Sequence, residues 1–273
     1  MAAAEELVRT LHAREPAADH RDTGRLHRSI VETSPYTLSV TFEGHLYDRA
    51  YFESLHRSHW FTNPPRKYEE RNRDTLRVVV PAPSDRVLEL GSARGDVSFF
   101  LARHAKEVVG VDASDDALQL AEAGRVRRGI SNVRFAKSDV ADLSAFADAS
   151  FDAVAAIDLV EHIDDPTLAA MLGECRRVLV VGGRLGLYTP DRAHYVERLK
   201  AHEVLLKQFP QHIAVRRAEA YRSFLFDAGF RVDLDTYSVS PFPGVRWIEA
   251  ALAPLPLVGP TFRYRILLGA VKP

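Results

Sequence analysis

Apolar runs and helical repeats alternate along the chain from residue 85 onward. Short apolar runs, each bounded by polar or glycine residues, predict buried strands at 86–90, 107–111, 132–136, 151–157 and 183–189. Between these runs the apolar residues recur at helical spacing, which predicts helices near 96–105, 114–127, 140–146 and 166–179. This alternation is typical of a parallel sheet with helices on both faces, so we expect an α/β domain.

Both flanks of the alternation carry further predicted elements. Before it, helices are expected at 47–58 and 66–80, and Pro81 and Pro83 end the second one. After it, the pattern predicts a helical insertion at 191–212, a helix at 216–228, a strand at 230–239, a proline-rich segment at 241–260 and a last strand at 263–271. We therefore divide the chain into a flexible tail at 1–28, a helical lid at 29–83 and a main domain at 84–273, in which residues 191–215 cap the substrate.

The turn after the first strand carries the clearest chemical signal. Gly91 and Gly95 bracket it, and residues without Cβ let a backbone approach a ligand closely. The second strand ends at Asp112, about 20 residues past the first glycine, where an acid that binds ribose is expected. Together these features predict a nucleotide-like cofactor across the carboxyl ends of the sheet.

The same turn argues against the dinucleotide cofactors. Their Gly-x-Gly-x-x-Gly pattern requires glycine at two positions where this chain has Ala93 and Asp96, and a carboxylate there opposes a pyrophosphate. No Gly-Lys-Ser/Thr sequence follows, so a P-loop is excluded as well. A cofactor with an adenosyl ribose and no phosphate fits better, which favours S-adenosylmethionine.

At this point the chain resembles the class I S-adenosylmethionine-dependent methyltransferases. Their first motif, Asp/Glu-x-Gly-x-Gly-x-Gly, corresponds to Glu89-Leu90-Gly91-Ser92-Ala93-Arg94-Gly95, with alanine at the middle glycine. Further matching segments are Asp112, Ser138-Asp139-Val140, Phe151-Asp152-Ala153-Val154 and Arg177-Val178-Leu179-Val180-Val181-Gly182-Gly183. The resemblance spans residues 85–190 and implies a Rossmann-like, seven-stranded, mostly parallel sheet with an antiparallel last strand.

The resemblance also implies roles for the residues of these motifs. Asp112 would accept hydrogen bonds from the ribose hydroxyls, Asp139 would meet the adenine amino group, and the backbone N–H of Val140 a ring nitrogen. A structural alternative for Asp112 is a helix cap, although Ser114 is the better cap. The full set of expected cofactor-binding residues is Glu89, Gly91, Ser92, Ala93, Gly95, Asp112, Ala113, Asp139, Val140 and Asp158.

The run Asp158-Leu159-Val160-Glu161-His162 follows the fourth strand, where the transferred methyl group is expected. It is similar to the Glu-x-x-Glu-His run that binds a divalent metal in ubiquinone-pathway O-methyltransferases and small-RNA 3′-end methyltransferases. We expect His162 to act as the catalytic base and no metal to be used. In the less favoured alternative, Asp158, Glu161 and His162 hold a divalent cation. In a third, Asp158 merely caps the loop while His162 acts as a base or packs.

Candidate acceptor-binding residues lie in the lid and after the fifth strand. Trp60 belongs to an aromatic segment that either closes over the acceptor or packs the lid on the core, and the two readings stay open. Tyr188 and His194 lie near the carboxyl edge, where the acceptor is expected. The arginines at 71–77 and 125–128 are predicted to form solvated helix faces.

The composition of the chain bears on the binding partners and the cellular location that we expect for the protein. The formal net charge of −1 offers no general attraction to nucleic acid, and the single cysteine, Cys175, is expected to pack in the core. No signal peptide is visible, so a cytoplasmic protein is expected, and the apolar segment 245–258 leaves an oligomer open.

We therefore expect an enzyme that methylates an oxygen or nitrogen of a small, cyclic or aromatic metabolite, with no nucleic-acid or membrane partner. The alternatives are a metal-dependent methyltransferase of RNA ends, and a protein that binds the cofactor without transferring a methyl group.

Overall fold

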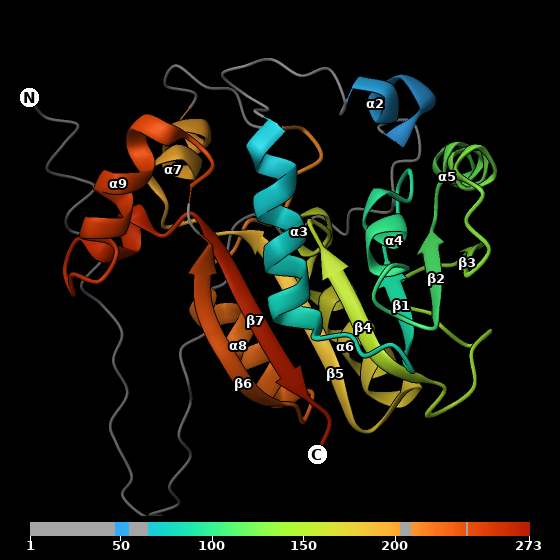
Figure 1. The fold of residues 1–273 in the computed structure, drawn as a ribbon. Coiled ribbons are helices and arrows are strands. Elements are labelled where there is room, and N and C mark those ends of the chain that lie inside the picture. The colour runs from blue at the N-terminus through green and yellow to red at the C-terminus, as the bar shows by residue number, and fades with distance from the viewer. Residues whose placement is uncertain (1–46, 55–64, 203–208, 239) are drawn as a thin grey trace, which may run out of the picture. The chain divides into compact units, whose positions relative to one another are not determined.

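The computed structural model describes residues 47–54, 65–202, 209–238 and 240–273 (Figure 1). The expected tail at 1–28 and the candidate Trp60 lie outside these residues. Of the expected lid, the helices α2 (Arg49–Ser54) and α3 (Pro65–Val79) are described.

A seven-stranded sheet forms the centre of the described part of the chain, in the order β3-β2-β1-β4-β5-β7-β6. Its strands are β1 (Arg86–Leu90), β2 (Glu107–Asp112), β3 (Val133–Lys137), β4 (Phe151–Ile157), β5 (Leu179–Pro190), β6 (Arg231–Ser238) and β7 (Arg265–Val271). The neighbouring pairs among β1 to β5 are parallel, whereas β7 runs antiparallel to both β5 and β6. This topology confirms the predicted Rossmann-like fold with its antiparallel last strand.

Helices cover both faces of the sheet (Figure 1). The remaining helices are α4 (Asp96–Leu101), α5 (Asp115–Arg128), α6 (Asp165–Val178), α7 (Tyr195–Ala201), α8 (Ala218–Asp227) and α9 (Pro243–Leu252), with short 3₁₀ turns η2 (Val160–His162) and η3 (Gly259–Phe262). One apolar core joins α6 and α8 to the sheet, and Cys175 is fully buried in it. The other core joins α3 and α4 to the opposite face through residues such as Val78 and Val97. No helix in the described ranges is long and apolar enough to cross a membrane.

Two predicted segments differ from the structure. Residues 140–146 form turns instead of a helix, because Asp139 and Asp142 each accept a hydrogen bond from the backbone two residues on, at 2.9 and 3.0 Å. The proline-rich segment 241–260 contains α9, in which Pro243 occupies the first turn, the one place where a helix tolerates proline. The insertion expected at 191–212 contains α7 over its described residues.

Candidate functional site

The turn between β1 and α4 has a backbone conformation that glycine adopts more easily than other residues. Gly91, Ala93 and Gly95 all have positive φ, at 66°, 46° and 81°. A Cβ built on Gly95 would lie 2.6 Å from the Phe135 ring, so packing as well as conformation requires glycine there. Ala93 carries its Cβ in the left-handed region, which is costly for residues other than glycine. The turn therefore keeps a strained backbone at the carboxyl end of β1.

Asp112 is held from two sides by backbone groups. Its Oδ2 accepts a hydrogen bond from the N–H of Ala93 at 2.8 Å, and its Oδ1 accepts one from the N–H of Ser114 at 2.9 Å. Burial raises the pKa of Asp112, although these backbone N–H groups oppose that shift. The alternative role as a helix cap belongs to Ser114, whose Oγ accepts from the N–H of Ala117. Asp112 thus presents a carboxylate of fixed orientation beside the glycine turn.

Glu89 is the buried acid at the end of β1. It is 3 % exposed and accepts a hydrogen bond from the hydroxyl of Ser98. Burial raises its pKa to about 8, which the Ser98 contact and the charge of Arg71 oppose. A positively charged ligand group would favour the ionised form of this carboxyl.

The loop after β3 lies in a different environment. Asp139 is exposed, and its Oδ1 accepts from the N–H of Ala141 at 2.9 Å. Val140 is half-buried against the core of the α6 face. Among the contacts of the described residues, this hydrogen bond engages one oxygen of the Asp139 carboxylate, and the second oxygen has further capacity to accept.

Asp158, the first acid after β4, forms ion pairs with two arginines. Its Oδ1 lies 2.5 Å from Nη1 of Arg265, and its Oδ2 lies 3.8 Å from Nη1 of Arg71. Although burial opposes it, these arginines hold the pKa of Asp158 below its usual value. Asp158 also has a positive φ of 54°, and its N–H donates to the carbonyl of Tyr188 at 2.8 Å.

Sequence reasoning missed both arginines. The prediction of a solvated face at 71–77 is wrong for Arg71, whose side chain is 18 % exposed against 52 % for Arg73. Arg71 faces Asp158 because α3 packs across β4, β5 and β7. No local motif marks Arg71 or Arg265, since neither lies near Asp158 in sequence.

Glu161 and His162 meet a residue that the sequence analysis did not single out. Ligand atoms of Glu161, His162 and His212 lie within 4.8 Å of one another, in a group that does not include Asp158. Burial lowers the pKa of both imidazoles, that of His212 to about 3, so both rings are neutral near pH 7. Nδ1 of His212 is buried and has no hydrogen-bond partner among the described residues. Neutral imidazoles beside a carboxyl are suitable ligands for a transition-metal ion.

The orientation of His162 is fixed by its neighbours. Nδ1 lies 2.9 Å from the carbonyl oxygen of Gln211 and 3.2 Å from the hydroxyl of Tyr47. A carbonyl only accepts, so the proton is on Nδ1 and Nε2 is the acceptor. This arrangement suits a proton-accepting base, and it equally suits a metal ligand.

The two described acceptor candidates are both buried. Tyr188 is 2 % exposed and lies in the core of the α3 face, with the guanidinium of Arg265 5.4 Å from its ring centroid. His194 is 1 % exposed, and its Nε2 lies 3.4 Å from Glu249 of α9. The structure thus brings Tyr188 close to Asp158 and Arg265, whereas His194 packs between α7 and α9.

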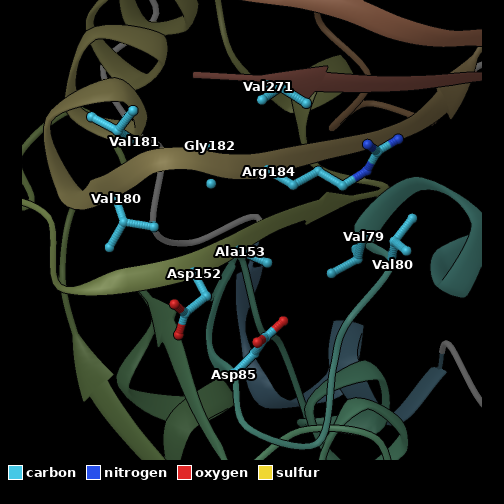
Figure 2. A pocket seen from close by; sticks show the side chains of 11 residues that line it. Val79, Val80, Asp85, Asp152, Ala153, Val180, Val181, Gly182, Arg184 and Val271 are labelled. Carbon is cyan, nitrogen blue, oxygen red and sulfur yellow. The ribbon is translucent and has the colours of Figure 1, made fainter. Parts of the chain in front are cut away.

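A pocket at the opposite edge of the sheet is a weaker candidate for the functional site than the carboxyl edge (Figure 2). It lies at the amino ends of β4 and β5, and its charged residues are already paired. Asp85 and Asp152 accept backbone N–H groups at 2.8 Å, and Arg184 binds Asp233 at 2.6 Å. The unpartnered buried groups of Arg71 and His212 lie at the carboxyl edge, where open α/β sheets bind ligands.

Comparisons with known proteins agree with this geometry. Residues 87–183 match the family model of a methyltransferase domain. A relative named ubiquinone biosynthesis O-methyltransferase, from Xylella fastidiosa strain 9a5c, is 34 % identical over 119 residues, which are 44 % of this chain and 47 % of that protein. The chain spans about half the length of the first curated relatives it matches.

Solved structures share the fold at low identity. A SAM-dependent methyltransferase from Aquifex aeolicus aligns with a TM-score of 0.59 and 16 % identity, over 83 % of this chain and 99 % of that one. The geranyl diphosphate C-methyltransferase of Streptomyces coelicolor A3(2), solved with Mg²⁺, geranyl diphosphate and S-adenosyl-L-homocysteine, aligns with a TM-score of 0.58 and 17 % identity, over 82 % and 84 %.

Proposed function

We propose that this chain, a member of the class I S-adenosylmethionine-dependent methyltransferases, transfers a methyl group to an oxygen or nitrogen of a small cyclic or aromatic metabolite. The observation that carries the proposal is the Asp112 carboxylate, which the N–H groups of Ala93 and Ser114 hold beside the strained turn. A carboxylate of fixed orientation suits the adjacent hydroxyls of a ribose.

The cofactor would extend along the carboxyl edge from that ribose. Its adenine would lie toward Asp139 and Val140, and its methionine end toward Glu89, which would face the ammonium. Arg71 would hold the methionine carboxylate, since its charge acts on both Glu89 and Asp158 and its Nε is buried without a partner among the described residues. This assignment gives each charged end of the cofactor an opposite charge.

His162 would take the proton from the acceptor. Its neutral ring has Nε2 as the acceptor atom, and the contacts of Nδ1 with Gln211 and Tyr47 fix its plane. Methyl transfer from a sulfonium is an in-line displacement, so alignment of the acceptor with the methyl group supplies much of the catalysis. A positioned base adds roughly 10²–10⁴-fold when the acceptor carries a proton.

The lid and the cap would exclude water and select the acceptor. In the lid, the carbonyl of Tyr47 accepts a hydrogen bond from Oγ of Ser114 at 3.0 Å. The carbonyl of Phe52 likewise accepts one from Nη1 of Arg94 at 3.1 Å. On the other side, the N–H of Ala214 donates to the carbonyl of Glu161 at 3.1 Å. These contacts support a closed pocket for a small acceptor, as does the name of the relatives, and the net charge of −1 gives RNA no general attraction.

A second candidate is a metal-assisted transfer, favoured by the grouping of Glu161, His162 and His212. One carboxylate and two neutral imidazoles fit a transition-metal ion better than Mg²⁺, which prefers oxygen ligands. Bound there, the metal would lower the pKa of a coordinated hydroxyl. Asp158 would take no part, because Arg265 and Arg71 occupy its carboxylate.

Labelled S-adenosylmethionine offered with a panel of phenols, catechols and cyclic amines tests the proposal. A labelled product that requires Asp112 and His162 supports it. Tight binding of S-adenosylhomocysteine without any product across the panel would favour the third alternative, a protein that binds the cofactor without transfer.

A further inference from the structure

Basic side chains from three separate elements gather around Asp158. Arg71 of α3 and Arg265 of β7 pair with its two oxygens, at 3.8 and 2.5 Å. Lys67 precedes Arg71 by one helical turn, so the two side chains share a face of α3. Asp158, Arg71, Arg265 and Lys200 of α7 are all close enough to act on the charge of Lys67. Lys67 therefore belongs to this cluster and not to the solvated side of α3.

The acids in the cluster do not balance these cations. Lys200 has its own partner, since its Nζ lies 2.7 Å from Glu197. Among the described residues, the acids of this cluster that remain for Arg71, Arg265 and Lys67 are Asp158 and Glu161, and Glu161 lies 3.6 Å from Arg265. The charge of Arg71 also acts on Glu89, which lies outside the cluster at the end of β1. Lys67 forms no hydrogen bond or ion pair with any residue that the structure describes. Burial, followed by the charge of Arg265, lowers the pKa of Lys67 to about 8, as expected of an unneutralised cation.

The cofactor does not remove this excess. S-adenosylmethionine carries a sulfonium, an ammonium and one carboxylate, so it adds positive charge to the pocket. With the carboxylate on Arg71 and the ammonium on Glu89, the sulfonium, Lys67 and Arg265 still face two acids. A buried cation without a partner costs free energy, and natural sites offset that cost with an opposite charge.

We infer that the acceptor carries an anionic oxygen group, a carboxylate or a phosphate, which Lys67 and Arg265 bind beside the atom that is methylated. This inference rests on the proposed function, because it assigns the residues next to the transferred methyl group to the acceptor. Lys67 supplies a free ammonium and Arg265 a planar guanidinium, and both groups bind carboxylate and phosphate oxygens. An anion there would neutralise the charge that neither the described residues nor the cofactor balances.

Three aromatic probes test the inference: benzoate, phenyl phosphate and benzamide, each titrated by ligand-observed NMR into protein saturated with S-adenosylhomocysteine. Benzoate and benzamide have nearly the same shape and differ in charge. We expect benzoate or phenyl phosphate to bind at least about tenfold more tightly than benzamide, and the preferred anion identifies the group. Lys67→Met should reduce this preference below about threefold and Lys67→Arg should keep it.

Lys106→Met is the matched control, because Lys106 is an exposed lysine that precedes β2 at the other edge of the sheet. It removes the same charge and should leave the preference unchanged. Equal affinities for the three probes, binding of none of them, or a preference that survives Lys67→Met would overturn the inference. Failure to bind S-adenosylhomocysteine itself would instead refute the proposed function, so the two failures are distinguishable.

Discussion

The two halves of the carboxyl edge are built in different ways. Around β1 and β2, the site consists of residues from consecutive elements, β1 to the start of α5, whose polar groups bind each other, as in the contacts of Asp112 with Ala93 and Ser114. Around β4, β5 and β7, charged side chains come from distant elements, and some buried groups have no partner among the described residues, such as Nε of Arg71 and Nδ1 of His212. The first half has one such group, the Ser92 hydroxyl, whereas those of the second half include charged and titratable side chains, so we expect further ligand groups mainly in the second half.

The largest expected effect is on the first half. Asp112→Ala removes both hydrogen bonds to a ribose, each worth about 1.5–3 kcal/mol when the acceptor is charged, so the Kd for S-adenosylhomocysteine should rise at least about 100-fold. Calorimetric titration measures this Kd. Asp115→Ala is the control, because Asp115 starts α5 three residues away and pairs with Lys137 at the surface. A Kd for Asp112→Ala within threefold of the unaltered protein would remove Asp112 from the cofactor site.

A change in the second half should act on the rate and spare cofactor binding. His162→Ala should lower kcat by about 10²–10⁴-fold through the loss of the base, with the Kd for S-adenosylhomocysteine unchanged. Steady-state assays with the acceptor found in the panel measure kcat, and calorimetric titration measures the Kd for S-adenosylhomocysteine. An equal loss of cofactor affinity would mean that His162 supports the fold of the first half and not the chemistry of the second.

The same assay separates the base from a metal ligand. If His162 acts alone as the base, EDTA has no effect and His212→Ala lowers kcat far less than His162→Ala. If Glu161, His162 and His212 hold a metal, EDTA and His212→Ala both abolish turnover, and added Mn²⁺ or Zn²⁺ restores it after EDTA. Full activity of His162→Ala in EDTA would exclude both roles.

The difference between the halves also explains what could be predicted from the sequence. The strand and helix pattern predicted the sheet, and it predicted that Asp112 ends the second strand, because both signals lie within short segments of the chain. Arg71, Arg265 and His212 could not be found in this way, since their positions depend on the strand order β4-β5-β7 and on the return of the chain after α7. The helix α9 was missed because its proline at the first turn was read as a loop signal.

The strained turn offers two substitutions with opposite expected signs. Gly95→Ala places a Cβ at a φ of 81° and 2.6 Å from Phe135, so we expect a loss of about 1–3 kcal/mol in the free energy of unfolding. Ala93→Gly removes a Cβ at a φ of 46° and should cause a gain of up to about 1 kcal/mol, reduced by the greater freedom of glycine in the unfolded chain. Urea denaturation of both variants measures the two changes in the free energy of unfolding. A loss of stability in Ala93→Gly would show that the alanine methyl packs favourably in the turn.

A further expected effect is the pH dependence that Lys67 causes in the second half. Burial, Arg265, Arg71 and Lys200 lower its pKa from 10.5 to about 8, while Asp158 opposes them. A lysine with a lowered pKa binds its proton less tightly in the folded state, so its charge destabilises the fold below pH 8 and this cost disappears as the pH rises toward 10.5.

The unaltered protein should therefore gain about 2 kcal/mol between pH 7.5 and 10 relative to Lys67→Met, which lacks the titrating group. Urea denaturation of both proteins across this pH range, without ligand, gives the difference directly. Lys106→Met should show no such divergence, because Lys106 is exposed. Parallel pH profiles for Lys67→Met and the unaltered protein would mean that Lys67 is neutralised in the folded chain, and the contrast between the two halves of the edge would then rest on Arg71 and His212.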